Sequence, residues 1–525
     1  MLKKVRNTSI TIFVLGIVLY GGFKIWESTW VKDPNWTPEE SFLYGSLGTE
    51  LVPLVVFQVL PDIFPENFQP AGKEAGDWMD QFGFIPTKNS PQNENLPYGI
   101  FVSNYQPGTG KPSPVKFVGF SCAICHTSKV RITEEDPGVI VYGMGSSSMD
   151  LAAFVDALKN SFLNEKKLSL DTINKAYKNK FQRGLSIVEK LVVHFWLKGA
   201  REALKAEIPM RNYPHGGMDL RNGELFKSGP SRNQPMMETI RFLLKDTPEP
   251  DGGYAKIPSL YMQEHRKWAH YDGTIGDVQT RNALAALGVG ANIENLRVPG
   301  ILKTIAMTTK YVAQLEGPKY EDLFETKGFS IDKARAENGS KVYIQYCKDC
   351  HGAPSPDKSN WINGKRHSEV VTTKELQTDP ARVNFQYYPK MADTIFEFFP
   401  EEHPLKPTRE NIRSYESVEK SGYVNNPIES TFSRVPYLHN GSILTLAELI
   451  NLKPRRDVFY RGANLYDPVD VGLKSPSAPD DQNYFKFDTS MYGNSNKGHN
   501  YPWSYNGTGW DKDKLEDLLE YLKTF

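Results

Sequence analysis

The pentapeptides Cys122-Ala123-Ile124-Cys125-His126 and Cys347-Lys348-Asp349-Cys350-His351 contain all four cysteines of the 525-residue chain. Two thiols three positions apart can each form a thioether with one vinyl group of a haem, and the adjacent histidine can then bind the iron. A thioredoxin-like dithiol does not require that histidine, and the cysteine pairs of a zinc site normally lie closer together in the sequence. The sequence therefore predicts two covalently bound haem c groups, with His126 and His351 as iron ligands.

The composition narrows the class of protein further. The chain carries 62 Lys and Arg residues against 62 Asp and Glu residues, so its formal net charge is zero. This balance provides no basic field, and nucleic acid is not expected as a partner. Hydrophobic residues make up 39% of the chain, which is enough for several packed cores in about two to four domains. Four cysteines in 525 residues exclude a disulfide-stapled scaffold.

The N-terminus has the pattern of an export signal or membrane anchor. Cationic residues in Met1–Arg6 precede the apolar stretch Ile10–Phe23, which is followed by Lys24 and Trp26. Because no small-x-small cleavage site follows the apolar stretch, an uncleaved anchor is favoured over a cleaved signal. We therefore expect residues 1–30 to hold a periplasmic or extracytoplasmic protein at the inner membrane.

Helical patterns and loops rich in glycine and proline alternate along the rest of the chain. The sequence predicts a mainly α fold of two cytochrome c-like haem domains with long loops, preceded by the N-terminal membrane or signal segment. The first haem domain is expected over residues 31–325, and a class I cytochrome c-like domain over residues 326–525. The predicted helices are Met149–Phe162, Ile187–Leu204, Arg232–Leu244, Ser330–Tyr346 and the amphipathic Lys512–Phe525.

The second axial ligand of each haem decides its chemistry. A haem with two protein ligands carries electrons, whereas an open sixth position can bind oxygen or peroxide. For the second haem the candidates are His499, which follows the polar loop Gly493–Gly498, His439, and Met391, which lies 40 positions after His351. Spacing alone does not choose among these three.

The first haem has its own set of candidate residues. The aromatic turn Trp268–Gly273 contains the candidate catalytic residues Trp268, His270 and Tyr271, whose rings could relay electrons or pack as ordinary core aromatics. His270 or His265 could also provide a second ligand to this haem. Haem propionates need cationic partners, for which the candidates are Arg232, Arg281 and Arg434.

With these segments in view, the chain resembles the bacterial di-haem cytochrome c peroxidase superfamily, and within it the di-haem rubber oxygenases and their relatives. The resemblance is spread over most of positions 120–525. The stretches that carry it are Phe120–His126, Trp268–Gly273, Arg281–Gly290, Cys347–Gly352, Val435–Leu449, Phe459–Gly472, Phe487–His499 and Leu519–Thr524.

The resemblance implies a haem ligated by His126 with an available sixth site, and a second, electron-storing haem ligated by His351 and His499. It also implies an aromatic residue between the haems, here Trp268 or Tyr271, and a calcium ion between the domains, for which the sequence identifies no ligands. Rubber oxygenases line the first haem pocket with apolar bulk, whereas His265, His270 and Tyr271 could make this pocket polar. The resemblance is therefore not taken to imply that this chain cleaves rubber.

The predicted function is that of an exported di-haem c-type cytochrome oxidoreductase of the peroxidase type. Peroxide would be reduced at the first haem, and an electron-donor cytochrome or other small redox protein would supply electrons through the second. One alternative is a haem-dependent oxygenase that uses dioxygen on an apolar organic substrate. Another is a non-catalytic electron-transfer cytochrome in which both haems have two protein ligands.

Overall fold

The computed structural model describes most of the chain from Thr29 onward. The described residues are 29–31, 35–69, 78–88, 90–207, 218–219, 224–225, 228–233, 253–355, 360–384, 388–476, 484–502 and 511–525. The predicted anchor over residues 1–30 lies almost entirely outside them. Within these ranges, no helix combines the length and the apolar character that crossing a membrane requires.

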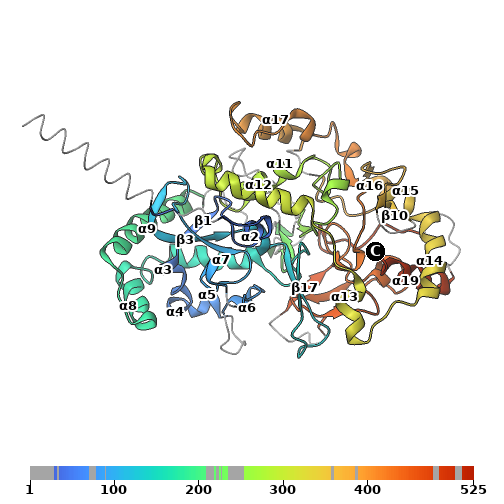
Figure 1. The fold of residues 1–525 in the computed structure, drawn as a ribbon, viewed down its shortest axis with the longest axis horizontal. Helices are drawn as coiled ribbons and strands as arrows, with labels where there is room; N and C mark the ends of the chain where they lie inside the picture. Colours follow the sequence, from blue (N-terminus) through green and yellow to red (C-terminus); the bar gives the residue numbers. More distant parts are fainter. Residues whose placement is uncertain are drawn as a thin grey trace, which may run out of the picture.

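Helices and short strands alternate along the described chain, and Figure 1 shows the earlier and later elements at opposite ends of an elongated molecule. The α-helices are α2 (Pro38–Tyr44), α3 (Leu54–Phe57), α4 (Leu60–Ile63), α5 (Pro65–Phe68), α6 (Trp78–Gln81), α7 (Leu151–Leu163), α8 (Leu170–Phe181), α9 (Ile187–Glu207), α11 (Val278–Gly288), α12 (Pro299–Ala313), α13 (Tyr320–Phe324), α14 (Lys333–Tyr346), α15 (Lys348–His351), α16 (Thr373–Leu376), α17 (Tyr388–Phe398), α18 (Leu446–Leu449) and α19 (Lys512–Leu522).

The strands belong to one three-stranded sheet and several two-stranded ones. The larger sheet has the order β1-β3-β2 and is antiparallel, with β1 (Glu50–Pro53), β2 (Ile100–Tyr105) and β3 (Pro112–Phe120). The two-stranded sheets are β4 (Thr127–Val130) with β5 (Val139–Tyr142), β6 (Met218–Asp219) with β7 (Glu224–Leu225), β8 (Arg232–Asn233) with β9 (Ala255–Lys256), β10 (Ala353–Pro354) with β11 (Trp361–Ile362), β12 (Val370–Thr372) with β13 (Gly422–Val424), β14 (Val458–Arg461) with β17 (Phe485–Asp488), and β15 (Tyr466–Asp467) with β16 (Gly472–Leu473).

The core of the N-terminal half lies between the three-stranded sheet and the helices that cover it. Both α3 and α9 contact β3, and α7 packs against α9. Phe154 of α7 is fully buried at the centre of an aromatic group, stacked on Trp78 and edge-to-face with Phe84. Asp150 caps the N-terminus of α7 by accepting a hydrogen bond from the backbone N–H of Ala153. This sheet and its helices form the support from which the first cysteine motif extends.

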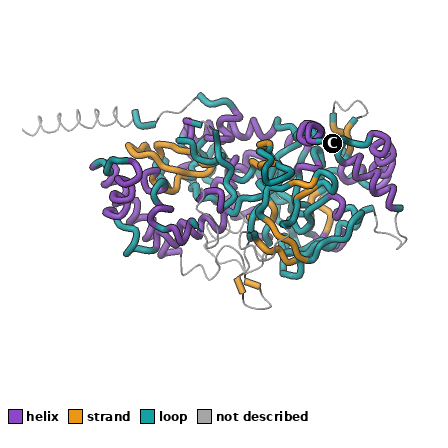
Figure 2. Tube along the Cα trace, turned by 90° about the horizontal axis from the view of Figure 1, so that it is seen from below, coloured by secondary structure: helices purple, strands orange, loops and turns teal. Residues whose placement is uncertain are grey.

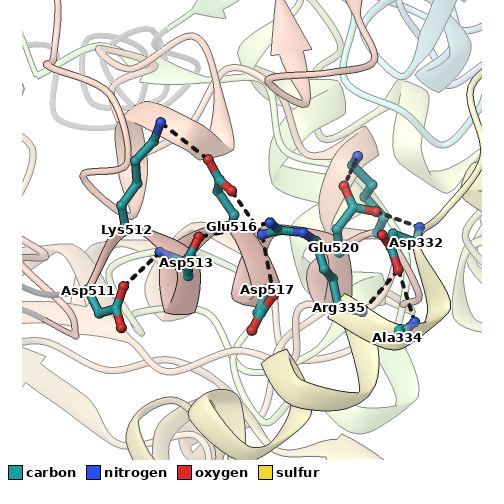
Figure 3. Close-up of polar contacts among 10 residues, drawn as sticks. Asp332, Ala334, Arg335, Asp511, Lys512, Asp513, Glu516, Asp517 and Glu520 are labelled. Atoms are coloured by element: carbon teal, nitrogen blue, oxygen red, sulfur yellow. Dashed lines mark hydrogen bonds and ion pairs between the residues drawn. The ribbon is translucent and has the colours of Figure 1, made fainter.

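The C-terminal half is organised by the crossing of α14 and α19. The two helices approach closely at Gly339, where an added Cβ would lie 1.9 Å from the carbonyl oxygen of Asp517. Figure 3 shows Arg335 of α14 facing the acidic side of α19, where its Nη1 lies 2.8 Å from Glu516. A second core of buried aliphatic and aromatic residues surrounds this crossing and also includes Val130, Val141 and Tyr261 from the N-terminal side.

The predicted fold class is wrong. The described residues do not form a mainly α fold with two cytochrome c-like haem domains behind a membrane segment; they form a mixed fold with many small sheets, and no described helix could span a membrane. Figure 2 shows these short strands interspersed with loops and helices. The reason is that the loops rich in glycine and proline contain strands of only two to four residues, some of which pair with partners far away in the sequence.

Most of the individually predicted helices are present. The expected helices at Met149–Phe162 and Ile187–Leu204 correspond to α7 and α9, and those at Ser330–Tyr346 and Lys512–Phe525 correspond to α14 and α19. The expected helix at Arg232–Leu244 is not found in its described part, because Arg232 and Asn233 form strand β8. Its remaining residues lie outside the described ranges.

Candidate functional site

The first cysteine motif follows directly on strand β3. Cys122–Ile124 form one turn of 3₁₀-helix, and the backbone N–H of Ser121 donates to the carbonyl of Gly99 at 2.8 Å. Gly99 has a φ of 82°, and an added Cβ there would lie 1.9 Å from the backbone nitrogen of Ile124. Only glycine allows this close approach of the two backbones. The sheet therefore holds the motif in a defined place.

His126 is oriented through one of its ring nitrogens. Its Nδ1 lies 2.9 Å from the carbonyl oxygen of Pro258. Because a carbonyl can only accept, Nδ1 carries the proton and Nε2 has its lone pair available. A histidine that binds a metal through Nε2 commonly donates its Nδ1–H in this way.

The second cysteine motif lies at the end of α14 and repeats this arrangement. Cys347 ends that helix, and its N–H donates to the carbonyl of Tyr343. His351 ends the short helix α15, and its Nδ1 lies 2.9 Å from the carbonyl oxygen of Asn426. In both motifs the histidine is thus the tautomer that leaves Nε2 free.

His499 lies next to His351. The two ring centroids are 6.1 Å apart with an interplanar angle of 47°, and both rings line one cavity of about 270 Å³, together with Cys347 and Cys350. The backbone N–H of His499 donates to the carbonyl of Leu376 at 2.9 Å. The ring nitrogen Nδ1 of His499 is buried and has no hydrogen-bond partner. With metal–nitrogen bonds of about 2 Å, two imidazoles on opposite sides of one iron have ring centres about 6 Å apart. These residues therefore fit a haem with two histidine ligands.

The competing sixth ligands are placed differently. Met391 is 1% exposed and packs in a separate core with Ile395 and Phe399, so it does not line this cavity. His439 does line the cavity, but its ring is stacked on Tyr423 with centroids 4.0 Å apart. The Tyr423 hydroxyl donates to the carbonyl of Asp379, so the 2.9 Å contact from His439 Nε2 requires that nitrogen to donate.

The three candidate catalytic residues of the turn Trp268–Gly273 lie in different surroundings. Trp268 is 5% exposed, and the guanidinium of Arg413 lies 4.6 Å from its ring centre. Tyr271 lines the cavity of the second motif. Burial lowers the pKa of His270 to about 4, partly opposed by Asp272. Of the three residues, Tyr271 is therefore the one placed at the wall of a candidate haem cavity.

Two of the predicted arginines lie near the motifs. Arg281 is 9% exposed, donates from Nη1 to Gln263 at 3.1 Å, and acts electrostatically on Cys122 and His126. Arg434 lines the second cavity, and its Nη2 is buried without a partner. Arg232 instead donates hydrogen bonds from Nε to the carbonyl oxygen of Ser228 at 2.8 Å and from Nη1 to Oδ1 of Asn494 at 2.6 Å.

Sequence reasoning missed three further cations of the second cavity, Lys256, Arg266 and Arg366. Lys256 is only 7% exposed, although lysine is a typical surface residue. The signal that could have found it is its place in Tyr254–Ile257, where a lysine stands between otherwise apolar residues.

The thiols themselves lack the character of a reactive dithiol. Burial raises the pKa of Cys122 to about 11 and that of Cys347 to about 12. A redox-active dithiol requires the opposite, a thiol pKa lowered toward neutrality. Among the described residues, no group of three or more His, Cys, Asp or Glu side chains is placed to hold a metal ion, so the structure assigns no ligands to the expected calcium.

Comparison with known proteins gives relatives but no activity. Residues 39–126, which end at the histidine of the first motif, match the Y4iN-like domain. The uncharacterized protein y4iJ of Sinorhizobium fredii is 24% identical over 524 residues, covering 86% of this chain and 85% of that protein. The uncharacterized protein y4iM of the same organism is 25% identical over 307 residues, covering 51% of this chain and 64% of that protein.

Proposed function

We propose that the chain is an exported oxidoreductase of the peroxidase type with two covalently bound haem c groups. The observation that carries the proposal is the pair His351 and His499, whose ring centroids lie 6.1 Å apart beside Cys347 and Cys350. The repeated contact from histidine Nδ1 to a backbone carbonyl supports the same function for both motifs. The resemblance to bacterial di-haem cytochrome c peroxidases is consistent with this proposal.

The surroundings of the two motifs favour different roles. Bound haem supplies one-electron chemistry, and at an open sixth position it also supplies binding of peroxide or dioxygen. His351 and His499 would hold the second haem from both sides, as in an electron-storing centre. Arg281, Gln263 and Asn282 are buried polar residues beside the first motif, and Arg281 donates to both of the others. Charged and polar donors favour peroxide over an apolar organic substrate.

The two motifs share a structural element, which supports electron relay between them. Pro258 accepts the hydrogen bond from His126 and also lines the cavity of His351 and His499. Lys256 and Ser259 of the same segment line this cavity too. The proposed external partner is a small electron donor, such as a cytochrome, and the proposed location is the periplasmic side of the inner membrane.

Two measurements on the purified full chain test the proposal. Mass spectrometry of chymotryptic peptides should find one haem on the Cys122–Cys125 peptide and one on the Cys347–Cys350 peptide. Carbon monoxide added to the reduced protein should bind one haem of the two, and peroxide should oxidise a reduced small cytochrome in its presence. Absence of haem from either peptide would overturn the proposal. Carbon monoxide binding to neither haem would favour a pure electron carrier, and oxygen uptake with isoprenoids would favour an oxygenase.

A further inference from the structure

Four cations line the cavity around His351 and His499. Arg366 forms ion pairs with Glu369 and Glu375, and we call the other three, Lys256, Arg266 and Arg434, the cation wall. Lys256 is buried, and the two arginines are partly buried. Lys256 Nζ donates to the carbonyl of Arg434, and Arg434 Nε donates to the carbonyl of Glu429 at 2.7 Å. The remaining donors are not satisfied, since Arg434 Nη2 and Arg266 Nε are buried without a hydrogen-bond partner.

These three cations repel one another. Burial lowers the pKa of Lys256 well below its ordinary value, and the nearby charges of Arg434, Arg461 and Arg266 lower it further. Burial also lowers the pKa of Arg266 to about 9, again with a contribution from Arg434. Like charges held together away from water destabilise a fold unless anions compensate them.

The carboxylates of the described residues compensate the cation wall only in part. Glu429 is the carboxylate that acts on both Arg266 and Arg434. Arg461, which also acts on Lys256, is opposed by Asp150, and Arg382 is paired with Asp272 at 3.0 Å. The cation wall therefore has fewer carboxylates beside it than cationic groups, and the two carboxylates of one haem would supply further negative charge.

We propose that Lys256, Arg266 and Arg434 bind the two propionate carboxylates of the haem attached to Cys347 and Cys350, and that they raise its reduction potential. This inference rests on the proposed function. Charge-assisted hydrogen bonds from buried guanidinium and ammonium groups to carboxylates are strong and directional. Reduction removes one positive charge from the haem, so nearby cations that are weakly screened by water favour the reduced form.

The test uses the full protein with both haems bound. Lys256→Gln, Arg266→Gln and Arg434→Gln each remove one positive charge, and optical redox titration measures the midpoint potential of the second haem. Each substitution should change the reduction equilibrium at least tenfold toward the oxidised form, a fall of about 59 mV. Lys256→Arg keeps the charge and should keep the potential.

Lys365→Gln is the matched control. It removes the same charge near the same motif, because Lys365 Nζ lies 3.5 Å from Asp349, but its side chain is 84% exposed and therefore screened by water. Its potential should stay that of the unsubstituted protein.

The outcomes separate the inference from the proposed function. Unchanged potentials in all three Gln variants, each with a full second haem, would overturn the inference. A selective loss of haem from the Cys347–Cys350 peptide, with the Cys122–Cys125 peptide still loaded and Lys256→Arg loading normally, would support it. Absence of haem from the unsubstituted protein would overturn the proposed function itself.

Discussion

The carbonyl oxygen of Pro258 lies 2.9 Å from Nδ1 of His126, and Pro258 also lines the cavity that contains His351. One short segment therefore orients the histidine of the first motif and forms part of the wall of the second. The segment is held on both sides, since the N–H of Ile257 donates to the carbonyl of Ser231 and that of Lys256 to the carbonyl of His439. A displacement of this segment would alter both candidate haem sites together.

Replacing His499 should change the second haem alone. His499→Ala removes the imidazole whose ring centroid lies 6.1 Å from that of His351, so the iron should go from six-coordinate low-spin to five-coordinate high-spin. Electron spin resonance and the visible spectrum measure this change. Met391→Leu is the control and should leave both spectra unaltered, because Met391 packs in a separate core. A low-spin second haem in His499→Ala would point to another ligand.

The crossing of α14 and α19 should tolerate no side chain at Gly339. A Cβ there would lie 1.9 Å from the backbone oxygen of Asp517, so Gly339→Ala must push the helices apart. We expect a loss of about 1–3 kcal/mol in the free energy of unfolding, measured by denaturant titration.

Gly199 provides the opposite case within helix α9. Its added Cβ would meet nothing within 4 Å. Gly199→Ala should therefore raise the free energy of unfolding by about 1 kcal/mol through helix propensity alone. Equal effects of the two substitutions would show that the close helix approach has no energetic consequence.

The buried ion pair of Asp272 and Arg382 should contribute far more to folding than the exposed pair of Arg335 and Glu516. The side chains of Asp272 and Arg382 are 0% and 7% exposed, and those of Arg335 and Glu516 are 39% and 33% exposed. Arg382→Met leaves a buried carboxylate without its cation and should cost about 3–5 kcal/mol. Arg335→Met should cost about 1 kcal/mol or less, because water screens that pair. Denaturant titration compares the two, and similar losses would contradict this expectation.

Local sequence patterns predicted some parts of the fold and not others. The patterns over Ser330–Tyr346 and Lys512–Phe525 predicted α14 and α19, and both helices are found there, capped by Asp332 and Asp511. The short strands were missed because of their length, and some also pair with a distant partner, as Val370 does with Val424. A two- or three-residue strand carries almost no periodic signal of its own, so its existence depends on tertiary contacts.

In the candidate site too, some features were predicted from local sequence and others depend on tertiary contacts. The cysteines and their adjacent histidines were predicted to bind haem from their spacing, because covalent haem attachment requires that spacing. The choice between His499 and Met391 was open from spacing, and only the packing of the chain places one near His351 and the other in a core. The burial of Lys256 was hard to predict from the sequence, because it depends on the pairing of β8 with β9 and on the contact with Arg434.

His439 should make the stability of the protein depend on pH. Burial lowers its pKa to about 3, so the folded protein keeps this imidazole neutral while the unfolded chain protonates it near pH 6.5. The contribution of His439 is therefore complete above pH 6.5 and is lost as the pH falls toward 3, by about 1.4 kcal/mol per pH unit. His439→Gln keeps a donor for Tyr423 but cannot take up a proton, so its unfolding free energy should fall less steeply between pH 6.5 and pH 4.5. Denaturant titrations across that range measure the slopes. Identical slopes for the unsubstituted protein and His439→Gln would mean that His439 does not take up a proton on unfolding.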